Sequence, residues 1–336
     1  KYPNFDEAYG GFVNQNKDVI KKMLNKSSEW DSFIEYYWPT TIGWPDKKIQ
    51  EVTFNKKEFN KSDGFVFTWL GHSTILMKLN GKTILIDPVF SDFASPLSFI
   101  AKRFQEPVIE LSYLPSVDYI LISHDHYDHL DKKTVEFFKN KKTKFIVPLG
   151  VHTHLEYWGI DKSLISELNW WENVKFGELK FTLTPAQHYS GRIKFIDNAT
   201  LWGGWIIQSN EHTLFFSGDS GYASHFKEIG ERFPKIDLAF MENGQYNWRW
   251  QEIHMLPEET AQAFKDLGAR KMVPIHWGMF NFSLHNWFDP PLDLQKFCKG
   301  CEIIVPQIGE VVDSSLQYPM PSKMFMFLLN EKELSL

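Results

Sequence analysis

From about residue 65 onward, short apolar runs alternate with segments whose apolar residues recur at helical spacing. Short runs rich in Val, Ile and Phe, bounded by turn-forming residues, are typical of buried β-strands. Strands are expected at 65–70, 74–79, 83–87, 117–123, 144–148, 179–185, 203–208, 213–218, 237–241, 270–275 and 302–306. An Asn80-Gly81 pair separates the second run from the third, which favours a tight hairpin and an antiparallel start to the sheet.

Helical patterns lie between several of these runs. They cover 131–140, 222–233, 257–267 and 291–298, and a further one lies near the start of the chain at 17–24. Asp131 is a candidate N-cap for the first of them. Since hairpins and crossovers both occur, we expect a layered α/β protein with two sheets and helices outside.

No Gly/Ser/Pro-rich linker, sequence repeat or long block of like charges divides the chain. We therefore expect one main domain at 65–312. An N-terminal extension at 1–64 should pack on this domain, and a C-terminal tail at 313–336 should follow it.

The 336 residues are 43% hydrophobic and carry a formal net charge of −6. A chain of this size can bury a large core, and a negative charge without a basic stripe argues against a nucleic-acid partner. The apolar patch at 324–329 is far shorter than the roughly 20 residues of a membrane-spanning helix. Cys298 and Cys301 form a lone CxxC pair, to which we give no function.

The densest group of metal-binding side chains follows the apolar run at 117–123. The sequence there is Ser-His-Asp-His-Tyr-Asp-His, which contains His124, His126, Asp128 and His129. Histidines two apart on an extended backbone point to the same side and can share a metal, whereas the turn at Asp128 directs a carboxylate and an imidazole toward a neighbouring site. A polar loop with solvated histidines is the alternative, and three histidines alternating with carboxylates beside a buried strand argue against it.

A metal centre needs more ligands than this loop supplies. Three further candidates, His188, Asp219 and His276, come soon after apolar runs. The carboxyl ends of strands form the edge where open α/β sheets collect their ligands. Each residue alone could be a capped turn or a satisfied polar group, but together with the loop they complete two sites.

The order of these residues resembles the metallo-β-lactamase superfamily. A longer series of motifs is similar to the N-acylphosphatidylethanolamine-hydrolysing phospholipase D family and its bacterial relatives. These motifs are GHST (71–74), IDPVFSDFASP (86–96), LISHDHYDHLD (121–131), VPLG (147–150), LNWWE (168–172), TPAQHYS (184–190), LWGGW (201–205), FSGDSGY (216–222), PEE (257–259) and IHWGMF (275–280). The resemblance covers about 68–291 and implies an αββα four-layer sandwich that holds two metals.

The ligand set implied by the resemblance is His124, His126 and His188 for one metal and Asp128, His129 and His276 for the other, with Asp219 as the bridge. Nitrogen and oxygen ligands suit zinc best, with iron or manganese as alternatives. The two divalent ions would share a hydroxide that attacks the substrate, and Asp128 would also belong to the catalytic residues. Asp87 is a candidate to anchor a histidine ligand, unless it only initiates the turn before Pro88.

Other polar residues could act on the substrate. His254 matches a histidine of the lipase-like relatives, and it could contact a phosphate or protonate a leaving oxygen, or it could be an exposed histidine in front of a helix. Arg192 and Arg249 could bind a phosphate, and they could equally be surface arginines. His72 lies in a turn between two expected strands, so we expect it to be structural.

The leading interpretation is a dinuclear-metal hydrolase of a phosphodiester bond, most specifically in an N-acyl phospholipid, with phospholipase D-type cleavage. A lactonase that acts on a sugar or acyl lactone with the same metal site is the alternative. The relatives have small residues where this chain has Met-Glu-Asn-Gly-Gln-Tyr at 241–246, so Glu242 and Gln245 could change the polarity of the pocket. An iron-dependent oxidoreductase fits less well, because His126 stands where diiron relatives have Glu, and a full ligand set argues against a metal-free binding module.

A lipid substrate raises the question of contact with a membrane surface. The segment at 89–100 follows an expected strand and carries Phe90, Phe93 and Leu97, and Lys102 and Arg103 come directly after it. This loop, with the aromatic Tyr-Tyr-Trp at 36–38, could touch a bilayer, or the aromatic residues could pack the extension onto the sandwich. We favour a cytoplasmic or peripheral membrane location, and an exported form stays open because the chain begins with Lys1. The oligomeric state is not indicated.

Overall fold

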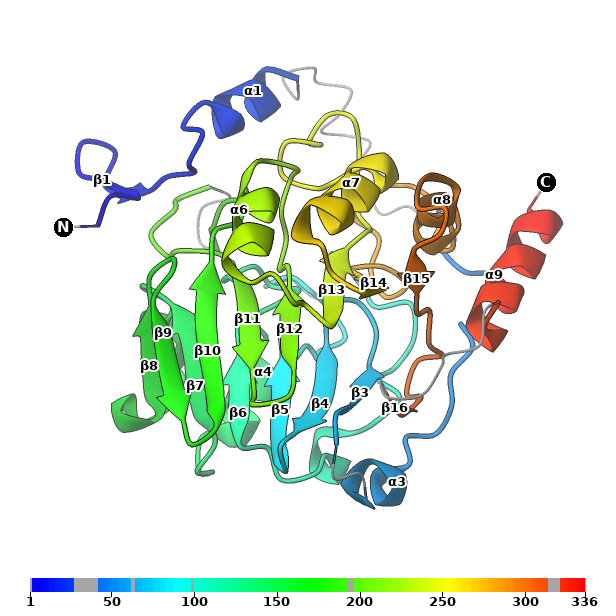
Figure 1. Ribbon diagram of the computed structural model, residues 1–336, viewed down its shortest axis with the longest axis horizontal. Helices are drawn as coiled ribbons and strands as arrows, with labels where there is room; N and C mark the ends of the chain where they lie inside the picture. The colour runs from blue at the N-terminus through cyan, green and yellow to red at the C-terminus, as the bar shows by residue number, and fades with distance from the viewer. Residues whose placement is uncertain are drawn as a thin grey trace.

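Two seven-stranded β-sheets lie face to face in the computed structural model, and helices cover their outer sides (Figure 1). The structure describes residues 2–26, 42–61, 64–97, 100–192, 196–313 and 321–335. The first sheet has the order β16 (Val312–Asp313), β3 (Val66–Trp69), β4 (Ile75–Leu79), β5 (Lys82–Ile86), β6 (Tyr119–Leu121), β7 (Lys144–Pro148) and β8 (Ile165–Leu168). The second has the order β15 (Glu302–Ile303), β14 (Lys271–Ile275), β13 (Leu238–Glu242), β12 (Thr213–Phe216), β11 (Gly204–Gln208), β10 (Leu179–Thr184) and β9 (Asn173–Phe176).

Both sheets are mixed. In the first, β16, β3, β4 and β5 pair antiparallel, and β5 to β8 pair parallel. In the second, β9 to β12 pair antiparallel, and β12 to β15 pair parallel. The hairpin between β4 and β5 turns at Asn80 and Gly81, both with positive φ, which confirms the expected hairpin.

Each parallel pair needs a crossover, and most of the helices lie in these crossovers. The helices of the two sheets are α4 (Lys132–Phe138), α5 (His152–Tyr157), α6 (His225–Arg232), α7 (Pro257–Leu267) and α8 (Asp289–Phe297), and two short 3-10 helices lie at Leu111–Tyr113 and Lys162–Leu164. Helix α7 has the bounds that the sequence predicts, because Pro257 starts it and Gly268, with φ of 63°, ends it.

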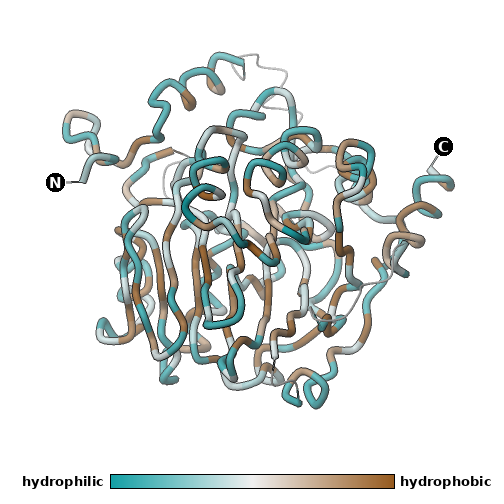
Figure 2. The backbone as a smooth tube through the Cα atoms, viewed as in Figure 1, coloured by the Kyte–Doolittle hydropathy of each residue, from teal (hydrophilic) through white to brown (hydrophobic). Residues whose placement is uncertain are grey.

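Alternate residues of the inner strands enter two different hydrophobic clusters. On β5, Ile84 and Ile86 face the cluster between the sheets, whereas Leu85 faces the cluster under α4 and α5. On the other side of the second sheet, Phe226 of α6 and Phe264 of α7 extend the first cluster. Figure 2 shows the hydrophobic stretches along the strands, with hydrophilic residues gathered in the connecting loops. These layers form the αββα four-layer sandwich that the sequence predicts.

The terminal segments lie on the outside of the sandwich (Figure 1). The extension forms a hairpin of two short strands, β1 (Phe5–Asp6) and β2 (Gly11–Phe12), followed by α1 (Val19–Lys26) and α3 (Lys56–Lys61). At the other end, α9 (Lys323–Leu334) packs Met324, Phe325 and Leu328 into the main cluster. The domain boundaries at 64–65 and 312–313 stay predictions. The residues at 36–38 lie outside the described part of the chain.

Several elements differ from the expectation. β8 and β9 were not expected, because both are half-exposed and lack a long apolar run. The patch at 324–329 belongs to α9, which Ser322 caps by accepting a hydrogen bond from the Phe325 backbone N–H at 3.1 Å. Cys298 and Cys301 form a disulfide between α8 and β15, although the sequence suggested no role for them.

Candidate metal centre

The candidate ligands lie where strands of both sheets end. The loop after β6 carries the histidine cluster, and His188, Asp219 and His276 follow β10, β12 and β14. Parallel strands bring their carboxyl ends to one edge of a sheet. Because the sheets face each other, the two edges lie side by side and the four segments meet in one buried centre.

One group of ligands consists of three imidazoles. The Nδ1 of His126 lies 3.0 Å from the Nε2 of His124 and 3.2 Å from the Nε2 of His188. His124 and His188 are fully enclosed. Three ring nitrogens that converge at such distances form a pocket of metal-binding atoms rather than a set of solvated side chains.

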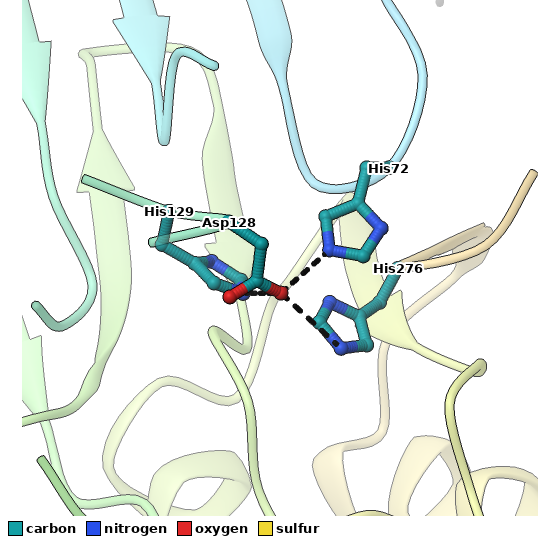
Figure 3. Close-up of side chains that lie close together, drawn as sticks. All are labelled: His72, Asp128, His129 and His276. Atoms are coloured by element: carbon teal, nitrogen blue, oxygen red, sulfur yellow. Dashed lines mark hydrogen bonds and ion pairs between the residues drawn. The ribbon is translucent and has the colours of Figure 1, made fainter. Parts of the chain in front are cut away.

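A second group surrounds the carboxylate of Asp128, as Figure 3 shows. Its Oδ2 lies 3.3 Å from the Nε2 of His129 and 4.0 Å from the Nε2 of His276. The same oxygen makes a 2.8 Å hydrogen bond with the Nε2 of His72. This group therefore contains one more imidazole than the sequence suggested.

Asp219 lies between the two groups. Its Oδ1 is 3.2 Å from the Nε2 of His129 and 3.2 Å from the Nδ1 of His276. Its Oδ2 is 3.7 Å from the Nε2 of His124 and 3.8 Å from the Nε2 of His188. One carboxylate thus presents one oxygen to each group.

The expectation that His72 is only structural is incomplete. It does occupy the turn between β3 and β4, but its backbone pairs with the loop after β14: the His72 N–H donates to the Trp277 carbonyl at 3.2 Å, and the His276 N–H donates to the His72 carbonyl at 2.9 Å. The two imidazole rings lie 4.2 Å apart as a result. A turn from one sheet and a loop from the other therefore form one wall of the centre.

The backbone around the centre is strained. His72, Asp87 and His276 have φ values of 51°, 42° and 70°, which are uncommon for residues with a Cβ. Each such conformation costs about 1–3 kcal/mol and persists only where surrounding contacts enforce it. Gly244 shows how tightly the loops pack, because a Cβ there would lie 2.0 Å from the His276 carbonyl oxygen.

Carboxylates and carbonyls orient the rings from behind. Asp87 Oδ2 lies 2.7 Å from the Nδ1 of His129, and Asp87 also accepts hydrogen bonds from the backbone N–H and hydroxyl of Ser123. The Nδ1 of His188 donates to the Ile253 carbonyl at 3.1 Å. Such contacts hold the other ring nitrogen toward the centre, as metal-binding histidines require.

The N-terminal extension reaches the same histidine. The Asn14 side chain accepts from the His188 backbone N–H at 3.0 Å and donates to the His188 carbonyl at 2.7 Å. The sequence offered no signal for this contact, because 174 residues separate the two.

Two polar atoms of the predicted ligands lack hydrogen-bond partners among the described residues. The Nε2 of His129 and the Oδ1 of Asp219 are buried without a hydrogen bond in the described part of the chain. Burial lowers the pKa of His124 and His188 well below the usual value, and it raises the pKa of Asp219 to about 7. Imidazoles such as His124 and His188, whose burial favours the neutral form, together with an unsatisfied oxygen of Asp219, fit divalent cations, which would compensate this cost of burial.

His254 lies beside the centre, on the loop before α7. Its Nδ1 is hydrogen-bonded to the Oε1 of Glu242. The centre of its ring lies 5.2 Å from the centre of the His188 ring and 5.4 Å from the centre of the His276 ring. Its side chain is 13% exposed, so part of it can be reached by solvent. The sequence left open whether His254 belongs to the site. The structure places its ring beside His188 and His276, and a role in the reaction stays a prediction.

Glu242 is the least expected member of the site. It ends β13 and is fully buried, and its Oε2 accepts a hydrogen bond from the Ser220 N–H at 2.7 Å. Burial raises its pKa well above the usual value. The oxygens of Glu242 and Asp219 and the nitrogens of His254 and His276 form a third group within 4.8 Å. Gln245, by contrast, donates to the Phe280 carbonyl at 2.9 Å and holds a loop.

The two arginines differ in their surroundings. The Nη1 of Arg192 donates to the carbonyls of Asp125 and Leu130, each at 2.7 Å, and its guanidinium lies over the ring of Tyr127. It therefore braces the histidine loop from behind. Arg249 is half-buried beside Trp248, with its guanidinium 5.1 Å from that ring. Substrate binding by either arginine stays a prediction.

Comparisons with known proteins place these residues in a family. The model of the β-lactamase superfamily domain matches residues 82–277. A phospholipase D of Caenorhabditis elegans described as N-acyl-phosphatidylethanolamine-hydrolysing is 33% identical over 80% of this chain and 83% of its own length. A metal-dependent hydrolase of Geobacillus thermodenitrificans is 31% identical over 72% of this chain and 94% of its own.

Solved structures agree on the fold. The isothiocyanate hydrolase from gut bacteria of Delia radicum superposes with a TM-score of 0.59 at 20% identity, and the match covers 74% of this chain and 98% of that one. Among the described residues, no helix is both long enough and apolar enough to span a bilayer.

Proposed function

The chain belongs to the β-lactamase superfamily and is a metal-dependent hydrolase, and on that premise we propose that it cleaves a phosphodiester bond of an N-acyl phospholipid at a centre of two divalent ions. The class of substrate is supported by the worm relative and by the series of motifs that this chain has in common with that family. Cleavage of the phospholipase D type would release phosphatidic acid and an N-acylethanolamine.

Asp219 is the observation that carries the proposal of two ions. A carboxylate can bridge two metals by offering one oxygen to each, and the two oxygens of Asp219 face different sets of imidazole nitrogens. We assign the ligands as His124, His126 and His188 at one position and Asp128, His129 and His276 at the other, with Asp219 between them. The donors are nitrogen and oxygen, and both cysteines of the chain are in a disulfide, so zinc fits best, with iron or manganese as alternatives.

When bound, two divalent ions lower the pKa of a water molecule and polarise the phosphoryl group. The protein's part is to hold this chemistry in a dry, fixed geometry. Asp87 fixes the ring of His129, the Ile253 carbonyl fixes that of His188, and Arg192 fixes the loop that carries the first histidines. His72 gives Asp128 a hydrogen bond and so fixes the carboxylate that we include among the catalytic residues.

We assign proton transfer to His254. Its Nδ1 is engaged by Glu242, so the Nε2 is the atom that can give a proton to the leaving oxygen. Glu242 acts as a positioning residue, because its other oxygen is held by the Ser220 N–H and its carboxylate cannot turn away. Burial lowers the pKa of His254, so its protonated form gives up the proton more readily than an ordinary imidazolium does.

The experiment is a hydrolysis panel with freshly purified protein of measured metal content. N-acylphosphatidylethanolamine, bis-p-nitrophenyl phosphate and an N-acyl homoserine lactone serve as substrates, and the reaction is repeated in ¹⁸O-labelled water. We expect hydrolysis of both phosphodiesters, with the label in phosphatidic acid, because attack at phosphorus leaves the water oxygen there. Turnover of the lactone without turnover of either phosphodiester would replace this proposal with the lactonase.

A further inference from the structure

A cavity of about 530 Å³ lies at the opposite edge of the first sheet from the metal centre. Lys82, Tyr119 and Lys144 begin β5, β6 and β7 and line this cavity. Since these strands are parallel, their other ends lead to the metal centre, and Tyr119 is five residues of extended chain, or roughly 16 Å, from His124. The cavity is therefore separate from the site described above.

The walls of the cavity are built by specific contacts. The segment at 111–118 forms one wall, and Lys56 of α3 holds it by donating to the carbonyls of Tyr113 and Leu114 at 3.1 and 3.0 Å. From the other wall, the Thr143 hydroxyl donates to the Val117 carbonyl at 2.8 Å. The cavity thus has walls that are held in place, one of them by a residue of α3.

Positive charge is concentrated in this cavity. Four lysines line it, namely Lys82, Lys141, Lys142 and Lys144, together with a single carboxylate, that of Asp118. Lys82 pairs with Asp118 at 2.9 Å. Among the described residues, no carboxylate forms an ion pair with any of the other three lysines. On a chain with a net charge of −6, this is an unneutralised basic site.

Aromatic rings hold two of these lysines in place. The Nζ of Lys141 lies 4.3 Å from the centre of the Phe137 ring, and the Nζ of Lys144 lies 5.0 Å from that of Phe176. Cation–π contacts of this kind restrict a flexible ammonium group without neutralising its charge. When a ligand binds there, these lysines lose less side-chain entropy than freely moving lysines would.

We propose that this cavity binds a phosphate group, carried either by a soluble phosphate ester or by an anionic phospholipid headgroup. Lysine binds phosphate as a compact point charge. Three ammonium groups without a carboxylate partner suit a ligand with two negative charges better than they suit a ligand with one carboxylate group. The half-buried side chains of Leu111 and Phe137 provide apolar surface for the organic part of the ligand. This inference does not depend on the reaction at the metal centre.

The test is site-resolved acetylation of lysines in the holoenzyme, followed by mass spectrometry. Lys144 reports on the cavity, and Lys227, exposed on α6, reports on the rest of the surface. Glycerol 3-phosphate and vesicles of phosphatidic acid are the two probes, with glycerol and vesicles of phosphatidylcholine as uncharged or zwitterionic controls. We expect at least fivefold slower acetylation of Lys144, but not of Lys227, with one or both phosphate probes.

The variant Lys141→Glu plus Lys142→Glu should need at least tenfold more probe to protect Lys144. Lys265→Glu plus Lys299→Glu changes the charge equally elsewhere and should retain protection, and Lys142→Gln replaces the double variant if a thermal melt shows that it is unfolded. Protection by glycerol 3-phosphate indicates a soluble ligand, and protection by vesicles alone indicates a headgroup. No protection by either probe, equal protection of Lys227, or protection that persists in the Lys141/Lys142 variant would overturn the proposal.

Discussion

At the scale of single residues, the centre depends on carboxylates whose two oxygens contact different partners. Asp219 presents its oxygens to two groups of imidazoles, and Glu242 binds Ser220 with one oxygen and His254 with the other. Removing such a residue leaves buried partners unsatisfied on both sides, which costs more than the loss of one contact. Substitutions here should therefore separate metal binding from proton transfer.

Asp219→Ala is expected to lower the bound divalent ions from about two per chain to one or none, because the bridge between the two positions is lost. Elemental analysis of purified protein checks this. Asp293→Ala, which changes a half-buried carboxylate of α8 paired with Lys296, is the control and should keep the wild-type metal content. A wild-type protein that purifies with a single ion would contradict the dinuclear proposal.

His254→Asn and Glu242→Gln are both expected to lower kcat on a phosphodiester, by roughly tenfold to a thousandfold for His254, with metal content unchanged. The Glu242 variant should also move the pH profile of kcat, because His254 loses the carboxylate that holds its Nδ1. His212→Asn, a half-exposed histidine, is the matched control. Wild-type kcat in the His254 variant would remove this residue from the mechanism.

At the scale of elements, α6 carries a histidine that does not belong to the centre. The side chain of His225 is buried against Phe226, and its Nε2 lies 3.2 Å from the hydroxyl of Ser220. Burial lowers its pKa to about 3. In the unfolded chain the imidazole titrates near 6.5, so the unfolded state takes up this proton first as the solution becomes acidic.

The contribution of His225 to stability is therefore complete above about pH 6.5 and declines as the pH falls from there toward 3. Between pH 7 and pH 5, wild type should lose about 2 kcal/mol more of its unfolding free energy than His225→Gln, whose amide does not titrate. Urea denaturation at the two pH values measures this difference. Protonation of the metal ligands lowers the unfolding free energy of both proteins and cancels in the comparison. Equal losses of unfolding free energy in wild type and His225→Gln would therefore show that His225 is not buried as a neutral ring.

At the scale of the whole molecule, a long loop connects β5 and β6. Its two arms pair through Phe93 and Lys102, and the Ala94 N–H donates to the Ala101 carbonyl at 2.9 Å. Leu97 is 48% exposed and Lys102 is also exposed. Arg103 is not available to lipid headgroups as the sequence suggested, because its Nη1 donates to the Val89 carbonyl in the interior and the residue is 5% exposed.

Contact with a membrane therefore depends on the exposed part of this loop. Wild type is expected to sediment with anionic vesicles, and Leu97→Ser plus Lys102→Gln should bind several-fold less, since the apolar tip and the cation are both lost. Leu329→Ser, an exposed apolar residue of α9, is the control and should bind like wild type. Wild type that stays in the supernatant would exclude this loop as a membrane contact.

The sequence by itself determined the elements and ligands that depend on neighbouring residues. Apolar runs predicted strands such as β7, and Pro257 and Gly268 predicted the limits of α7, because strand and helix signals act within a few residues. The spacing of His124 and His126 likewise predicts a common metal, since an extended backbone places both rings on one side.

Only the tertiary structure decided which further residues contact the predicted ligands. His72 is 56 residues from Asp128, and Asn14 is 174 residues from His188. The sequence suggested only that Glu242 could change the polarity of the pocket, and its contact with His254 is visible in the structure alone. The same holds for the hydrogen bond from the Nη1 of Arg192 to the Asp125 carbonyl, while phosphate binding by Arg192 stays a prediction. A side chain's partner is set by the burial and packing of loops from both sheets, and no local pattern in the sequence encodes that meeting.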